Sequence, residues 1–181
     1  MRKSIWALMG LVLLLGLAVS VAAAPPGRRR GAAAAEPQAQ AQSQLPQAVS
    51  SAVASAFPGD KVADSEQETE EGVSAYFVEL SSGTEVFVTA DGVILEVAYK
   101  AQMSSFPAAA AQALQKAGAG ATLDGAQRVE VRAEIEGGKA VKLAKPDTEY
   151  SATFKKGGKV GEVRALADGT VPDPIEWEID D

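Results

Sequence analysis

The sequence contains no cysteine, no histidine and no asparagine. Without cysteine and histidine, the chain cannot form disulfides or assemble the usual ligand sets for zinc, copper, haem or iron–sulfur clusters. The lack of histidine also excludes Ser-His-Asp and Cys-His catalysis. Carboxylates, Lys, Arg, Tyr and hydroxyl groups remain. We therefore expect a non-enzymatic binding or inhibitory module with no catalytic residue, no metal and no cofactor.

The N-terminal segment has the pattern of a secretory signal peptide. Arg2 and Lys3 form a charged start, an apolar stretch follows, and Val21-Ala22-Ala23-Ala24 supplies the small residues of a cleavage site. We expect residues 1–23 to be a signal peptide and the mature protein to be periplasmic or extracellular.

An uncleaved membrane anchor is the alternative for the same segment. Its apolar run is about as long as a membrane-spanning helix requires, and Arg28-Arg29-Arg30 on the far side would oppose translocation. Membrane contact is expected only in that case. Residues 24–44 are rich in Pro, Ala and Gln without apolar periodicity, which predicts a disordered linker.

The rest of the chain contains a weak internal repeat. At an ungapped offset of 66 residues, matches fall largely on glycines and glutamates. The identical pairs are Glu68 with Glu134, Gly72 with Gly138, Gly92 with Gly158, Glu96 with Glu162 and Val97 with Val163. Upstream, an offset of 61 residues aligns two Ala-rich segments that begin near a proline. We infer two units, residues 45–100 and 101–166.

Each unit has the pattern of a helix followed by an antiparallel meander. The helical stretch after Pro46 ends at Pro58-Gly59, and the period of apolar residues then changes to two. The strands expected are 73–80, 84–90 and 93–99 in the first unit and 128–136, 139–144, 148–155 and 159–166 in the second. The predicted fold class is α+β, with two tandem units of one helix packed on a three- or four-stranded antiparallel sheet.

These motifs resemble the PepSY domain family. The residues that carry the resemblance are Leu45-Pro46, Phe57-Pro58-Gly59, Tyr76, Val78, Val86, Val88 and the run from Asp91 to Val97. The first unit is similar to small exported PepSY-like proteins with a beta-lactamase-inhibitor-like fold, and the second unit diverges from them. The resemblance implies a non-catalytic extracytoplasmic module that restrains or partners a peptidase, and it transfers no catalytic residue.

Four acidic residues, Asp64, Glu66, Glu68 and Glu70, alternate along one segment and in a strand would share one face. We interpret this segment as an exposed sheet edge whose charges discourage aggregation. A surface for a partner protein is the alternative. A calcium site is disfavoured because the segment lacks the EF-hand pattern and a straight strand cannot surround an ion.

Charge is distributed unevenly along the chain. Residues 45–100 hold 2 basic and 10 acidic side chains, whereas residues 101–166 hold 10 basic and 7 acidic ones. Residues 167–181 add 6 acidic side chains and no basic one. An acidic surface of this kind repels nucleic acid, so we expect no nucleic-acid partner.

The C-terminal segment, residues 167–181, ends in an alternating pattern typical of a half-buried strand. Ile175, Trp177 and Ile179 would lie on one face and acidic residues on the other. The strand either pairs with the basic second unit or is offered to the sheet edge of a partner, with Trp177 as the anchor.

The expected function is that of an exported binding module that modulates or inhibits a peptidase of the cell envelope or engages another envelope protein. The expected partner surface consists of Asp64, Glu66, Glu68, Glu70, Ile175, Trp177 and Ile179. The alternatives are a structural envelope protein without a dedicated ligand and a hydrolase using two carboxylates. The hydrolase would need two acids about 5 to 10 Å apart in a cleft.

Overall fold

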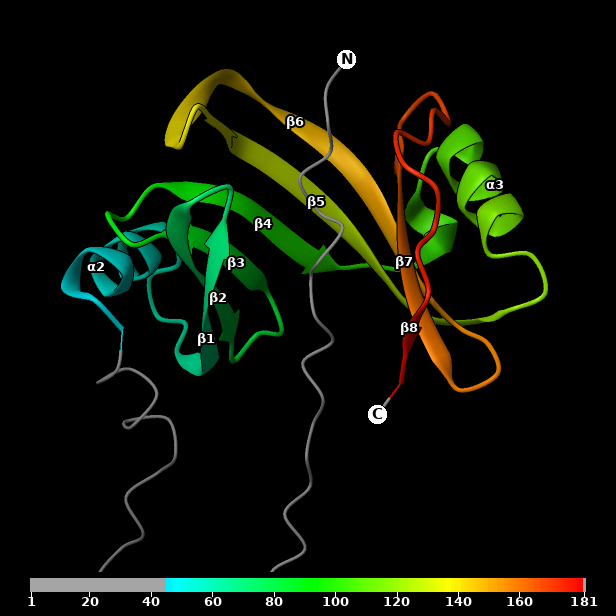
Figure 1. Ribbon diagram of the computed structural model, residues 1–181, viewed down its shortest axis with the longest axis horizontal. Helices are drawn as coiled ribbons and strands as arrows, with labels where there is room; N and C mark the ends of the chain where they lie inside the picture. Colours follow the sequence, from blue (N-terminus) through cyan, green and yellow to red (C-terminus); the bar gives the residue numbers. More distant parts are fainter. Residues whose placement is uncertain (1–44, 181) are drawn as a thin grey trace, which may run out of the picture.

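The computed structural model describes residues 45–180, which form an α+β fold of two helices and one curled, eight-stranded antiparallel sheet (Figure 1). The helices are α2 (Gln47–Ala56) and α3 (Ala108–Ala117), with a 3₁₀ turn, η1 (Met103–Ser105). The strands are β1 (Val62–Glu70), β2 (Val73–Leu80), β3 (Glu85–Thr89), β4 (Ile94–Lys100), β5 (Thr122–Glu136), β6 (Lys139–Lys155), β7 (Lys159–Leu166) and β8 (Glu178–Ile179). The expected signal peptide and linker lie outside the described residues.

The two helices each begin after a proline, Pro46 or Pro107, whose missing N–H costs nothing at a helix start. Each helix has 10 residues, too few to be stable alone in water. Both are stabilised by packing one apolar stripe against the sheet. None of the helices in residues 45–180 is long and apolar enough to cross a membrane.

The sheet joins the two predicted units into one body. Its strands lie in chain order from β1 to β8, so β1 and β8 are the edges. The pairing of β4 with β5 runs from Glu96 opposite Val131 to Lys100 opposite Gln127, and it crosses the boundary that we predicted between the units. The sequence left open whether the sheets of the two units are continuous, and the structure shows one continuous sheet.

The two faces of the sheet differ because the helices cover only one of them. Two apolar clusters lie beneath the helices, one centred on Val49 and Val53 of α2 and the other on Ala110 and Leu114 of α3. A third cluster lies on the opposite side and consists of Ala75, Phe87, Leu95, Ala133 and Ile135, with Val73, Phe77, Val93 and Ala140 at its margin.

We call the side away from α2 and α3 the inner face, because the sheet curls toward it. Same-face residues of β2 and β5 belong to the third cluster although β3 and β4 lie between those strands. They share a cluster because the long β5–β6 hairpin bends over β2 to β4, as Figure 1 shows.

Strand β6 corrects one prediction. We expected two strands, 139–144 and 148–155, with a break at Lys145-Pro146-Asp147, and the structure has a single strand of 17 residues. The break is a bulge instead, since Val131 pairs with Asp147 and Ala133 pairs with Lys142. Pro146 cannot donate to a ladder, and a bulge is where a strand tolerates it.

The repeat alignment at an offset of 66 residues is corrected for the same reason. It matches Gly72 with Gly138, and both lie at the turn of the first hairpin after a helix. It then matches Gly92 with Gly158, which lie in the β3–β4 and β6–β7 turns. After the first hairpin, the offset therefore aligns the third turn after α2 with the second turn after α3. This mismatch arises because β6 is one strand where two were expected.

Candidate functional site: the inner face of the sheet

Three rows of side chains cross the inner face, because residues opposite one another in paired strands point to the same side. The first row is Asp64, Glu79, Glu85, Ala98, Val129, Glu149 and Leu166. The second is Glu66, Phe77, Phe87, Glu96, Val131 and Asp147. The third is Lys100, Gln127, Ser151 and Arg164. The rows contain seven acidic and two basic side chains, so the inner face is acidic.

The centre of the inner face is a buried ionic network around Arg164. Arg164 Nη1 lies 2.9 Å from Glu96 Oε2 and 3.5 Å from Glu149 Oε2, and Arg164 Nε lies 3.2 Å from Glu162 Oε1. The Ser151 hydroxyl donates a hydrogen bond of 2.8 Å to the same Glu162 oxygen. Only 9% of the Arg164 side chain and 6% of the Glu96 side chain are exposed. One guanidinium thus holds three carboxylates together from β4, β6 and β7.

Burial sets the protonation of this network. Burial raises the pKa of Glu96 to about 7, although the nearby Arg164 lowers it, and the neighbouring Glu149 and Glu162 raise it further. Burial alone would lower the pKa of Arg164, but Glu96 and Glu162 raise it above its usual value. Arg164 therefore stays charged while Glu96 takes up a proton near neutral pH.

Glu85 extends the acidic region toward β3. Burial raises its pKa, while a hydrogen bond of 2.6 Å from Gln127 Nε2 to Glu85 Oε2 lowers it in part. Glu79 and Glu162 raise the pKa of Glu85 further, and Lys100 lowers it. These couplings show that the carboxylates of the first row and of the Arg164 network act on one another electrostatically.

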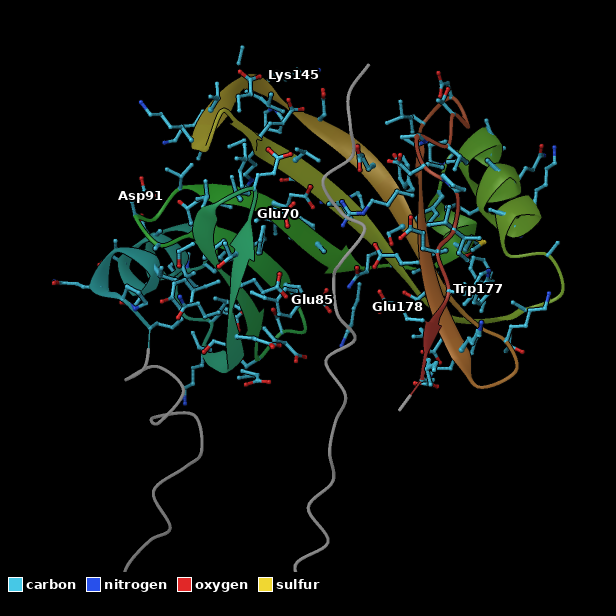
Figure 2. All side chains as sticks on the ribbon, viewed as in Figure 1. Glu70, Glu85, Asp91, Lys145, Trp177 and Glu178 are labelled. Carbon is cyan, nitrogen blue, oxygen red and sulfur yellow. The ribbon has the colours of Figure 1, made fainter. Side chains whose placement is uncertain are left out.

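The four predicted acidic residues lie together on β1, an edge strand, as expected. They point to the inner face, since their partners on β2 include Phe77 and Ala75 of the third cluster. The side chains of Asp64 and Glu66 are exposed, and those of Glu68 and Glu70 are half-buried. Burial first, and acidic neighbours second, raise the pKa values of Glu68 and Glu70. Figure 2 shows Glu70 and Glu85 in the first half of the sheet.

The C-terminal residues are docked on the protein itself, and only in part as a strand. Ile175 and Trp177 pack against the cluster beneath α3, whereas Ile179 is 71% exposed. Only Glu178 and Ile179 form β8, which pairs with Lys159 and Val160 of β7. The predicted single apolar face therefore holds for Ile175 and Trp177 and not for Ile179. Trp177 and Glu178 lie beside β7 in Figure 2, far from Glu70.

The outer face carries a smaller, paired set of charges between the helices. Arg128 and Arg132 contact Glu130 at 2.8 and 3.0 Å, and the Arg128 guanidinium lies 4.6 Å from the centre of the Tyr99 ring. Within residues 45–180, no group of three or more acidic side chains is arranged to hold a metal ion.

The Arg164 network was missed by sequence reasoning. Glu96 could have been found, because it is the one charged residue within an apolar stretch from Val93 to Tyr99. A charge in such a run is rarely buried unless it is paired. Its partner, Arg164, lies 68 residues away in the chain, and no local pattern connects the two.

The fold is similar to that of solved proteins from Bacteroides. A proposed periplasmic protein from Bacteroides eggerthii matches with a TM-score of 0.50 and 12% identity over 74% of this chain and 88% of the other. A BLIP-like protein from Bacteroides fragilis has a TM-score of 0.48 and 18% identity over 76% and 89% of the two chains. A DUF2874-family protein from Bacteroides uniformis has a TM-score of 0.49 and 12% identity over 74% and 89%.

At these identities the likeness extends to the fold alone. No family model and no curated protein matches the sequence.

Proposed function

We propose that the chain is a non-enzymatic, exported protein-binding module that receives a basic segment of its partner on the inner face. The observation that carries this proposal is the excess of acidic over basic side chains on a curled face that neither α2 nor α3 covers, with the carboxylates in the first two of its three rows. A concave surface of one charge sign attracts a partner of the opposite sign and speeds its association.

The inner face is suited to binding more than to catalysis. Glu96 has the raised pKa of a general acid and lies near a second carboxylate, as a hydrolase would require. However, its side chain is 6% exposed and is bound by Arg164. A substrate cannot reach it without breaking the network, so we assign the network a structural role beneath a binding surface.

An extracytoplasmic location and a peptidase partner complete the proposal. The signal-like residues 1–23 support export, and the fold is similar to that of the proposed periplasmic protein from Bacteroides eggerthii. The resemblance of residues 45–100 to PepSY modules supports a peptidase of the cell envelope as the partner. The pattern of one helix and an antiparallel meander on each side of the β4–β5 pairing supports two diverged copies of one unit.

The test uses the mature chain, residues 24–181, as bait in a periplasmic extract. We expect it to retain one stoichiometric protein that a Glu66→Gln/Glu79→Gln variant loses or releases at lower salt, because these side chains lie on the inner face. A Glu136→Gln/Asp173→Asn variant changes charge equally at exposed positions elsewhere and should retain the protein.

The identity of the retained protein then tests the finer claim. A peptidase whose activity changes when it is bound supports modulation. Equal retention by both variants would show that the inner face is not the binding surface. An empty bait lane would favour a structural envelope protein.

A further inference from the structure

The chain leaves β7 in the same way as it leaves β3. Gly92 N–H donates a hydrogen bond of 2.8 Å to the Thr89 carbonyl, and Gly169 N–H donates one of 2.9 Å to the Leu166 carbonyl. Both glycines follow Ala-Asp, at Ala90-Asp91 and Ala167-Asp168. The two turns therefore have the same sequence and the same backbone bonding.

Both turns also contact the helix that begins their half of the fold. A Cβ atom on Gly92 would lie 2.8 Å from the Ala48 carbonyl oxygen of α2, and one on Gly169 would lie 2.9 Å from the Ala109 carbonyl oxygen of α3. Since each turn has the same place relative to its helix, the segment after Gly169 starts where a strand equivalent to β4 would start.

The two segments then differ in main-chain pairing. After Gly92, β4 runs for 7 residues and pairs with β3 from Ile94 to Ala98. After Gly169, the chain contains Pro172 and Pro174, which have no N–H to donate. Within the described residues, the ladder between β7 and β8 consists of two residue pairs.

Side chains, more than main-chain bonds, hold this C-terminal segment in place. Ile175 and Trp177 pack against the cluster beneath α3. A Cβ atom on Gly161 of β7 would lie 2.7 Å from the Glu176 carbonyl oxygen and 3.0 Å from the Ile175 side chain. The segment thus occupies the edge of β7 without completing the strand.

We propose that the edge of β7 is a strand-addition site for an extended segment of a partner protein, and that residues 171–180 cover it in competition. The partner segment lacks proline, pairs with the β7 main chain and places apolar side chains two residues apart where Ile175 and Trp177 lie. This surface is separate from the inner face, so either proposal can fail without the other.

The probe for this site is a labelled peptide with the sequence of residues 93–100, Val-Ile-Leu-Glu-Val-Ala-Tyr-Lys, which follows the equivalent turn. We expect saturable binding to the mature chain, residues 24–181, by fluorescence anisotropy. Trp177 is the single tryptophan of that chain, and its emission should shift as the segment leaves its half-buried position. The same peptide with proline at its second and fourth positions should not bind.

Variants of the C-terminal segment give opposite expectations. Trp177→Ala weakens the packing of residues 171–180 against the protein. It should tighten peptide binding at least tenfold, because less free energy is needed to displace this segment from β7. Pro172→Val/Pro174→Val should let the segment pair with β7 and weaken peptide binding by a similar factor. Ile179→Ala, at an exposed position, should leave the affinity for the peptide unchanged.

Three results would overturn the proposal. One is the absence of peptide binding to both the mature chain and a folded Trp177→Ala variant, with folding checked by circular dichroism. Another is equal binding of the proline-containing peptide. The third is a concentration-dependent dimer with exchanged C-terminal segments, which would make the occupant a second copy of this chain.

Discussion

Arg164 holds three carboxylates of the inner face in place. A buried guanidinium with three carboxylates around it is costly to assemble, because burial removes the hydration of every charge. The cost is reduced by protonation of Glu96, whose pKa is raised to about 7. Arg164 therefore fixes the positions of β4, β6 and β7 relative to one another while the face remains acidic.

The protonation of Glu96 predicts a specific pH dependence of stability. Its pKa rises from an ordinary value of 4.5 to about 7 in the folded protein, so the folded state binds the extra proton. This contribution to the free energy of unfolding is fully present below pH 4.5 and is lost as the pH rises through 7.

Urea denaturation of the wild type and of Glu96→Gln across this range measures the effect. The stability of the wild type relative to the variant should fall as the pH rises. A difference that is independent of pH, or that rises with pH, would contradict the raised pKa.

At the scale of single elements, two glycine turns differ in how closely they approach a helix. Gly92 and Gly72 have similar φ angles, +88° and +80°, in a region where residues other than glycine are strained. Their surroundings differ, since a Cβ atom at Gly92 would meet the Ala48 carbonyl oxygen and one at Gly72 would meet nothing within 4 Å.

This pair of glycines predicts unequal costs for the same substitution. Gly72→Ala should lower the free energy of unfolding by about 1 kcal/mol, the cost of the left-handed conformation. Gly92→Ala should cost clearly more, because α2 must also move away from the turn. Thermal or urea denaturation measures both, and equal costs would show that the contact between turn and helix is unimportant.

At the scale of the whole molecule, the β5–β6 hairpin closes the curl of the sheet. Ile135, near the hairpin tip, is 5% exposed and belongs to the third cluster with residues of β2, β3 and β4. Val141 lies in the same hairpin but is 42% exposed. The hairpin therefore has one side that packs on the inner face and another that faces solvent.

Truncation at these two positions tests the closure. Ile135→Ala should lower the free energy of unfolding by about 3 kcal/mol, because it leaves a cavity in the third cluster. Val141→Ala should change it by less than about 0.5 kcal/mol. Hydrogen exchange should report faster exchange at the hairpin tip in Ile135→Ala alone, and equal effects would contradict the packing described.

Local patterns in the sequence determined the two helices, most strand segments and the alternation of acidic residues on β1. These features depend on residues close together in the chain. Prolines at helix starts, glycines at turns and the two-residue period of strands therefore indicate them directly in the sequence. The absence of histidine and cysteine likewise limited the chemistry without any structure.

Only the tertiary structure decided which face each strand turns inward, and it joined two predicted sheets into one. It also merged two predicted strands into β6 and paired Glu96 with Arg164 across 68 residues. These outcomes depend on pairing between distant segments, whose register is set by packing on both faces of the sheet and not by any local sequence pattern.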